Sequence, residues 1–297
     1  AITASTTSAN GSTIAGDYGS LKIGADGSYI YTVNNAHSAV QALAINETLT
    51  ETFAYQVHDG VGGYNAAALT ITITGTNDAP VTASITQTNL NEQITTSDLT
   101  SNITASFSDV DLTDIGHTAQ ITAVTVTGVT AGLSLTEAQL KDLISIGTVT
   151  KATGSTAGSV PMTFTAASTV FDYLAVNEVA TLSYTLEVDD HDGGKPTKTF
   201  VVQKPGTNDA PIITATAENI AGSITEGCTL SDSGSISFGD LDLTDRPTAT
   251  EATKSVSALK ADGSTVLALT SAQQQALENA FTITAESGND NDGSISW

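Results

Sequence analysis

The segment Gly75-Thr-Asn-Asp-Ala-Pro80 occurs a second time as Gly206-Thr-Asn-Asp-Ala-Pro211, 131 residues further along the chain. The same offset relates the acidic segments at residues 107–114 and 238–245, which share the pattern Asp-x-Asp-Leu-Thr-Asp. A register kept over this distance indicates a tandem array of one repeated module.

The repeat also predicts the module boundaries. In each copy of Asn-Asp-Ala-Pro, the proline removes a backbone donor and stops strand pairing, so both copies are interpreted as linkers. The modules are then residues 1–80, 81–211 and 212–297. Compared with the second module, the first lacks its beginning and the third lacks the counterpart of residues 174–202. We therefore expect more of the chain or another subunit to complete the third module, and interpret the sequence, which starts without signal-peptide features, as an internal fragment.

Alternating apolar and polar residues predict that strands dominate the fold. Residues 53–57 and 69–75 alternate around a Gly-rich turn, which is typical of a hairpin, and residues 182–188 and 200–202 repeat it. Further strands are expected at residues 20–23, 28–33, 121–127 and 161–165. The fold class is therefore all-β, with tandem antiparallel β-sandwich modules. Tyr29, Tyr31, Tyr55 and Tyr184 are expected to face the core.

A short helical insertion is expected in the second and third modules. Thr136 with Gln139, and Thr270 with Gln273, fit a capping box, in which each side chain bonds the other residue's backbone amide. Apolar residues follow each box at helical spacing. The helix is expected to cover an edge or end of the sandwich.

Composition limits the partners of the chain. With 32 acidic and 9 basic residues, the formal net charge is −23, which disfavours nucleic acid and anionic membranes and favours cations. The single cysteine, Cys228, excludes an internal disulfide framework. The sequence contains no apolar run near the ~20 residues of a membrane span, so no membrane insertion is expected.

Catalysis has little support in the sequence. The four histidines stand in polar or turn contexts without zinc spacing, and the chain has no Gly-x-Ser-x-Gly elbow. The one tryptophan, Trp297, offers no set of aromatic platforms for a sugar. We expect that the chain is not an enzyme.

The acidic segments predict a cation site. Asp109, Asp111 and Asp114 fall within six residues, and Asp240, Asp242 and Asp245 repeat them. Gathered carboxylates repel one another unless a cation lies between them, and Ca²⁺ accepts six to eight oxygen ligands in flexible geometry. The alternative is that these residues only form turns, because Asp and Asn bond their own backbone. Turns in solvent are the favoured interpretation for the hairpin acids Asp189, Asp190, Asp192, Asp290 and Asp292.

The chain resembles the cadherin-like repeats, also called VCBS repeats, of giant bacterial surface adhesins of the RTX-adhesin or biofilm-associated type. The resemblance rests on the Gly-Thr-Asn-Asp-Ala-Pro ends, on Asp-Gly-Ser-Tyr-Ile-Tyr-Thr-Val-Asn-Asn at residues 26–35, on Gln-Ala-Leu-Ala-Ile-Asn-Glu at residues 41–47, and on the Val-His-Asp-Gly hairpin. It implies an exported, extracellular protein of the bacterial cell surface, in which such repeats serve as extender segments.

The resemblance also implies where calcium binds. In this family, ions lie between modules and take ligands from the linker and from the following Asp-x-Asp. One expected site uses Asn77, Asp78, Asp109 and Asp111, with Glu92 as a further candidate. The other uses Asn208, Asp209, Asp240 and Asp242, with Glu226 in the same role.

The sequence thus favours a calcium-stiffened extender of an adhesin involved in cell adhesion and biofilm formation, whose partners are its neighbouring repeats. Two alternatives stay open. One is a module that binds a peptide or glycan at a surface, and the other is a set of accessory repeats of a secreted hydrolase.

Overall fold

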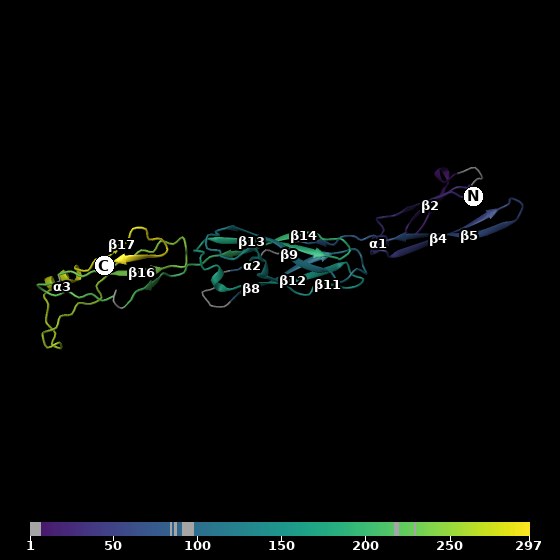
Figure 1. Ribbon diagram of the computed structural model, residues 1–297. Helices are drawn as coiled ribbons and strands as arrows, with labels where there is room; N and C mark the ends of the chain where they lie inside the picture. Colours follow the sequence, from purple (N-terminus) through teal and green to yellow (C-terminus); the bar gives the residue numbers. More distant parts are fainter. Residues whose placement is uncertain (1–6, 84, 86–87, 91–97, 217–219, 229) are drawn as a thin grey trace.

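The computed structural model describes residues 7–297 except 84, 86–87, 91–97, 217–219 and 229. Figure 1 shows an elongated molecule in which three groups of strands, β1–β5, β6–β14 and β15–β18, follow one another along the long axis. The fold is all-β, as predicted, with a few short helices between the strands.

The second module contains two sheets that face each other. The first has the order β10-β12-β8-β6, with β11 also paired to β12, and the second has the order β7-β14-β13-β9. All pairs are antiparallel except β7 with β14. The strand bounds are β6 (Val81–Thr82), β7 (Thr88–Asn89), β8 (Leu99–Ser108), β9 (Thr118–Gly128), β10 (Ile144–Ile146), β11 (Thr150–Lys151), β12 (Ala157–Ala166), β13 (Val179–Asp189) and β14 (Thr197–Pro205).

The core of this module lies between the two sheets. Along β13, every second residue is buried, and Leu182, Tyr184 and Leu186 are all 0% exposed. Val160 and Phe164 of β12 meet them from the opposite sheet. This is the alternation that the sequence predicts for a strand with one face in a core.

Both expected capping boxes are present. Helix α2 (Glu137–Asp142) begins after Thr136 and α3 (Ser271–Glu278) begins after Thr270, each with the reciprocal bonds to the glutamine three residues later. In α2, Leu140 is buried, and its carbonyl accepts a 3.0 Å hydrogen bond from the Tyr184 hydroxyl. The remaining helical turns are α1 (Ser38–Gln41) and the 3₁₀ turns η1 (Ser8–Asn10) and η2 (Ser168–Val170).

The first module has a three-stranded and a two-stranded sheet. The bounds are β1 (Ser12–Ala15), β2 (Gly19–Ile23), β3 (Tyr29–Val33), β4 (Thr48–His58) and β5 (Tyr64–Thr74). The expectation that its tyrosines face the core is wrong for Tyr29, which is 50% exposed, and for Tyr55, which is 41% exposed. The offset of 131 matches β3 with β12 and β4 with β13. Among the described residues, β3 has no neighbour equivalent to β8, and β4 has none equivalent to β9. The two small sheets therefore lack strands that would cover their inner faces, on which Tyr29 and Tyr55 were expected to be buried.

The third module forms one sheet of four short strands in the order β15-β16-β18-β17. Residues 249–259, the counterpart of β9, form no strand. Among the described strands, β9 of the second module pairs only with β13, and the third module has no described counterpart of β13. The bounds are β15 (Ile212–Thr214), β16 (Ser235–Gly239), β17 (Thr284–Ala285) and β18 (Gly293–Ser296).

Helix α3 also lacks the cover that α2 has. Leu277 is 52% exposed, whereas Leu140 of α2 is 6% exposed. Among the described residues, no helix is long and apolar enough to cross a membrane.

Candidate metal centres at the module junctions

The acidic loop after β8 meets the first linker at one end of the second module. Strand β8 ends at Ser108, which pairs with Val81 of β6, the strand that follows the linker. The fold therefore brings residues 109–114 beside residues 76–80. The Asp78 amide donates to Asp111 Oδ2 at 2.8 Å, and the Asp111 amide donates to Asp109 Oδ1 at 2.9 Å. We call this region the first junction.

The carboxylates of the first junction are buried and incompletely paired. Asp109 is 1%, Asp111 0% and Asp114 9% exposed. Within the described part of the chain, Asp111 Oδ1 and Asp114 Oδ2 are buried without a hydrogen-bond partner. Burial, together with the charge of the neighbouring carboxylates, raises the pKa of Asp111 to about 6. Burial likewise raises the pKa of Asp114. Such oxygens are costly unless a donor or a cation satisfies them.

A histidine lies inside this cluster. His117 is 4% exposed, so the polar context that the sequence predicts for it is a buried one, among carboxylates. Its Nε2 lies 2.8 Å from Asp109 Oδ2 and 3.7 Å from Asp114 Oδ2. Its ring packs on Phe107, with ring centroids 5.0 Å apart. One ligand atom from each of Asp109, Asp114 and His117 lies within 4.8 Å of the others.

The hairpin acid Asp190 also belongs to the first junction. It is 2% exposed rather than solvated, and its Oδ2 accepts a 2.9 Å hydrogen bond from Asn77 Nδ2 of the linker. The sequence contains a signal for this position, because Asp190 continues the buried alternation of Leu182, Tyr184, Leu186 and Val188 by one more step. The Gly-rich turn that follows Asp190 favoured the interpretation of a solvated turn instead.

A buried lysine holds the backbone of the acidic loop. Lys151, at the end of β11, is 9% exposed. Its Nζ donates to the carbonyl of Asp111 at 2.5 Å and to that of Asp114 at 2.6 Å. The lysine therefore fixes the backbone of the segment between Asp111 and Asp114.

Among the described residues, two further hydrogen bonds join the acidic loop to the part of the first module that precedes the linker. The Leu112 amide donates to the Ala42 carbonyl at 3.3 Å, and the Thr113 hydroxyl donates to Glu47 Oε1 at 2.7 Å. The acidic loop thus contacts the first module as well as the linker.

The second junction repeats this geometry 131 residues later. The Asp209 amide donates to Asp242 Oδ2 at 2.8 Å, and the Asp242 amide donates to Asp240 Oδ1 at 3.1 Å. The Leu243 amide donates to the Tyr173 carbonyl at 3.3 Å, as Leu112 does to Ala42. Asp242 is 0% exposed, and its Oδ1 has no hydrogen-bond partner among the residues that the structure describes. Burial raises its pKa to about 6.

Only part of the expected ligand set comes together at the second junction, among the described residues. Asp240, Asp242 and Asp245 form a group in which one carboxylate oxygen of each lies within 4.8 Å of the others. Asn208 is exposed, and its side chain bonds the Asp209 carbonyl. Glu226 lies in an exposed turn and is not part of the group. Glu92 falls outside the described residues.

The donor atoms fit a hard divalent cation. The groups offer mainly carboxylate oxygens, the ligands that Ca²⁺ prefers. At both junctions, the central aspartate has one oxygen bonded to the linker amide and one buried oxygen without a partner. A cation at the second oxygen would satisfy it without breaking the first bond.

Comparisons with known proteins agree with the all-β fold class of this chain. Residues 1–75 match the family model of the bacterial cadherin-like domain. A comparison with curated proteins found no match. This first part of the chain is therefore similar to a cadherin-like repeat, an adhesion-type module.

Solved structures give distant likenesses. They include protocadherin gamma B2 extracellular cadherin domains 3–6, with 13% identity, a TM-score of 0.34, and coverage of 70% of this chain and 44% of that chain. They also include zebrafish RET cadherin-like domains 1 to 4, with 13% identity, a TM-score of 0.32, and coverage of 95% and 56%. The CooA pilin subunit from enterotoxigenic Escherichia coli has 9% identity and a TM-score of 0.29, with coverage of 43% and 99%. The chain spans about half the length of the two cadherin structures.

Proposed function

We propose that the chain is a calcium-stiffened extender segment of a bacterial cell-surface adhesin, acting in cell adhesion and biofilm formation. In this proposal, the chain has three modules, residues 1–80, 81–211 and 212–297, which are arranged end to end as a rod. The observation that carries this proposal is the repeated junction. At both junctions, the amide of the linker aspartate (Asp78 or Asp209) donates to the central aspartate of the acidic loop (Asp111 or Asp242). The other carboxylate oxygen of that central aspartate is buried without a partner among the described residues.

The proposed ligands at the first junction are carboxylates and an amide of the linker, the acidic loop and the β13–β14 hairpin. They are Asn77, Asp78, Asp109, Asp111, Asp114 and Asp190. The proposed ligands at the second junction are Asp209, Asp240, Asp242 and Asp245, with Asn208 at the edge. Bound calcium would supply the positive charge that these buried oxygens lack.

Stiffness follows from which segments these residues connect. The linker would be a free hinge if only its peptide bonds joined the modules. Asp78 and Asn77 instead attach it to the acidic loop and to the hairpin, and Leu112 attaches the acidic loop to the first module. A ligand that binds only this arrangement stabilises it by mass action. The chain would then extend as a rod and project a distant binding domain.

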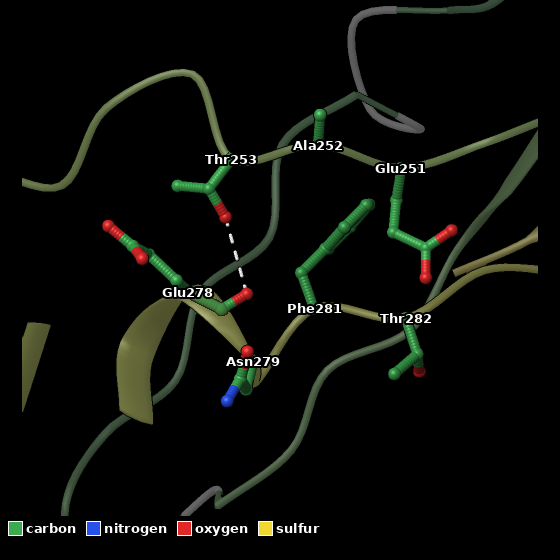
Figure 2. Close-up of a pocket in the computed structure, with 7 residues that line it drawn as sticks. All are labelled: Glu251, Ala252, Thr253, Glu278, Asn279, Phe281 and Thr282. Atoms are coloured by element: carbon green, nitrogen blue, oxygen red, sulfur yellow. Dashed lines mark hydrogen bonds between the residues drawn. The ribbon is translucent and has the colours of Figure 1, made fainter. Parts of the chain in front are cut away.

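The alternative of a peptide- or glycan-binding module has less support. A pocket of about 480 Å³ lies in the third module, lined by residues 251–253 and by residues at and after the end of α3 (Figure 2). The Phe281 ring lies inside it, while the carboxylates of Glu251 and Glu278 point in different directions. A binding site normally has convergent polar groups in an enclosed cleft. The accessory-repeat alternative is favoured by no feature of the described residues.

Calorimetric titration of the full chain with calcium tests the proposal. Asp111→Ala should remove the binding of the first junction and Asp242→Ala that of the second, so the double variant should bind least. Each variant should keep the circular dichroism spectrum of the parent. An unchanged number of bound ions in both single variants would reject the ligand assignment.

A further inference from the structure

The first junction contains a buried histidine beside two of its carboxylates, and a nitrogen donor is unusual for a calcium site. We infer that Asp109, Asp114 and His117 form an additional cation site, which takes a borderline divalent metal such as Zn²⁺ rather than calcium. The inference rests on the proposed function only in that Asp109 and Asp114 are also proposed calcium ligands. Calcium would be held beside them, by Asp111 and the linker.

The ligand atoms of this site already lie close together. His117 Nε2 is 2.8 Å from Asp109 Oδ2 and 3.7 Å from Asp114 Oδ2. One ligand atom of each of the three residues lies within 4.8 Å of the others. Zinc binds nitrogen and carboxylate oxygen at about 2.0–2.2 Å, so two ligands of one tetrahedral ion lie roughly 3.4 Å apart. The two measured separations bracket this value, so small side-chain movements would seat the ion.

An unpaired buried oxygen indicates an ion at this place. The Asp114 side chain is 7% exposed, and its Oδ2 has no hydrogen-bond partner among the described residues. The 3.7 Å that separate it from His117 Nε2 are too long for a hydrogen bond. A buried carboxylate oxygen without a donor is costly, and a metal ion shared with His117 would satisfy it.

The nitrogen ligand decides the class of metal. Calcium takes six to eight ligands, and they are oxygens. Imidazole instead suits zinc, copper, iron and nickel. A zinc ion with three protein ligands completes its four-coordinate shell with a water molecule. The three donors of this group therefore match zinc in number as well as in kind.

The surroundings hold each ligand in place before an ion binds. A backbone amide of the acidic loop donates to Asp109 Oδ1, while Oδ2 of the same carboxylate faces His117. Lys151 bonds the carbonyl of Asp114, and the Phe107 ring packs on the His117 ring. Ligands that need little reordering lose less conformational entropy on binding.

The second nitrogen of His117 limits the affinity of the site. Without a metal, Nε2 carries the proton of the bond to Asp109, because a carboxylate oxygen accepts. A metal on Nε2 would move that proton to Nδ1, which is buried without a partner within the described part of the chain. Binding thus exchanges one unpaired state of Nδ1 for another, and gives Asp114 Oδ2 a partner. Loss of the usual acceptor on the second nitrogen weakens a metal site about 10–100-fold, so zinc should bind less tightly than in a site with that acceptor.

Calorimetric titration of the full chain with zinc, in saturating calcium, tests the site. The parent should bind one equivalent of zinc more tightly than any further ions. His117→Gln removes the nitrogen ligand and should weaken this binding at least about tenfold. His191→Gln is the matched control and should keep it, since His191 is an exposed histidine whose Nδ1 lies 3.7 Å from Asp189 Oδ2. Equal zinc affinities in the parent and in His117→Gln would overturn the inference.

A second measurement on the parent chain does not depend on how the variants fold. Zinc should remove the proton from His117 Nε2 and change the nitrogen-15 shift of that atom, whereas calcium alone should leave the proton in place. Zinc that leaves this nitrogen unchanged would overturn the inference. So would zinc that displaces calcium from the first junction ion for ion, because both metals would then share one position.

Failure of the proposed function would give a different result. A chain that binds no calcium but still binds zinc through His117 would reject calcium stiffening and keep the zinc site. A chain that binds calcium at both junctions but no zinc would reject the zinc site and keep calcium stiffening.

Discussion

Asp190 and Asp59 are counterparts 131 residues apart, and their comparison separates a turn acid from a junction acid. Asp59 Oδ1 accepts the amides of Val61 and Gly63, and Asp190 Oδ1 accepts those of Asp192 and Gly194. Only Asp190 uses its second oxygen for a linker residue, Asn77. The same residue type in the same turn thus has an additional role where a module precedes it.

This pair gives a controlled prediction. Asp190→Ala and Asp59→Ala should weaken their hairpins to a similar extent, because both lose the same turn bonds. Asp190→Ala should also lower the calcium affinity of the first junction, whereas Asp59→Ala should leave calcium binding unchanged. Calorimetric titration of both variants against the parent measures this. Equal affinities in the two variants would remove Asp190 from the site.

The raised pKa values of Asp111 and Asp242 predict an unusual pH dependence without divalent cations. Both carboxyls have a pKa of about 6 in the folded chain, well above the ordinary pKa of an exposed aspartate, because burial disfavours their charged form. Between roughly pH 4 and 6 the folded state therefore binds more protons than the unfolded state, and this contribution to stability decreases as pH rises. In EGTA, the junctions should be more stable at pH 5 than at pH 7.

Calcium should reverse this trend, because it binds the ionised carboxylates. Thermal melts at both pH values in EGTA and in calcium measure the effect. The double variant Asp111→Asn, Asp242→Asn should lose most of the pH dependence in EGTA. Stability in EGTA that rises from pH 5 to pH 7 by the same amount in parent and variant would contradict the assignment of these groups.

Helices α2 and α3 show at the element scale that the same capping signal does not guarantee the same packing. Both have complete capping boxes. Leu140 of α2 is buried against the sandwich and Tyr184 bonds its carbonyl, whereas Leu277 of α3 is 52% exposed. Local residues start the helix in both modules, but neighbouring strands decide whether its apolar face is covered.

A pair of leucine substitutions tests this difference. Leu140→Ala should destabilise the second module by about 2–5 kcal/mol, the usual cost of truncating a buried leucine. Leu277→Ala should change the stability of its module by less than about 0.5 kcal/mol, as exposed positions do. Exchange of core amides in denaturant measures both values. Similar costs at the two positions would mean that α3 is packed as tightly as α2.

The sequence predicted the strands and hairpins because their residues alternate with period two, and it predicted both helix starts because capping is local. It predicted from the repeat that Asp109 and Asp111 correspond to Asp240 and Asp242, and all four are buried beside the linkers, while their role as ligands stays a prediction. It did not place His117 or Lys151 in a cluster, because the contacts of Lys151 join residues about forty positions apart. It misjudged Tyr29 and Tyr55, since alternation shows which face a residue is on but not whether another sheet covers that face.

At the scale of the whole molecule, charge and junction geometry act together. The formal net charge of −23 makes the modules repel one another, which favours an extended chain but does not fix the angle between modules. Fixing that angle requires the contacts of the linker and the acidic loop. The elongated arrangement in Figure 1 has these contacts at both junctions.

Small-angle scattering of the full chain tests the central claim most directly. The chain should be compared in millimolar calcium, in EGTA, and in EGTA with enough sodium chloride to match the screening. We expect a single elongated particle in calcium, and a smaller radius of gyration with a broader distance distribution in both EGTA samples, because the junctions then bend. Distributions that are identical in calcium and in EGTA would show that calcium does not stiffen the chain.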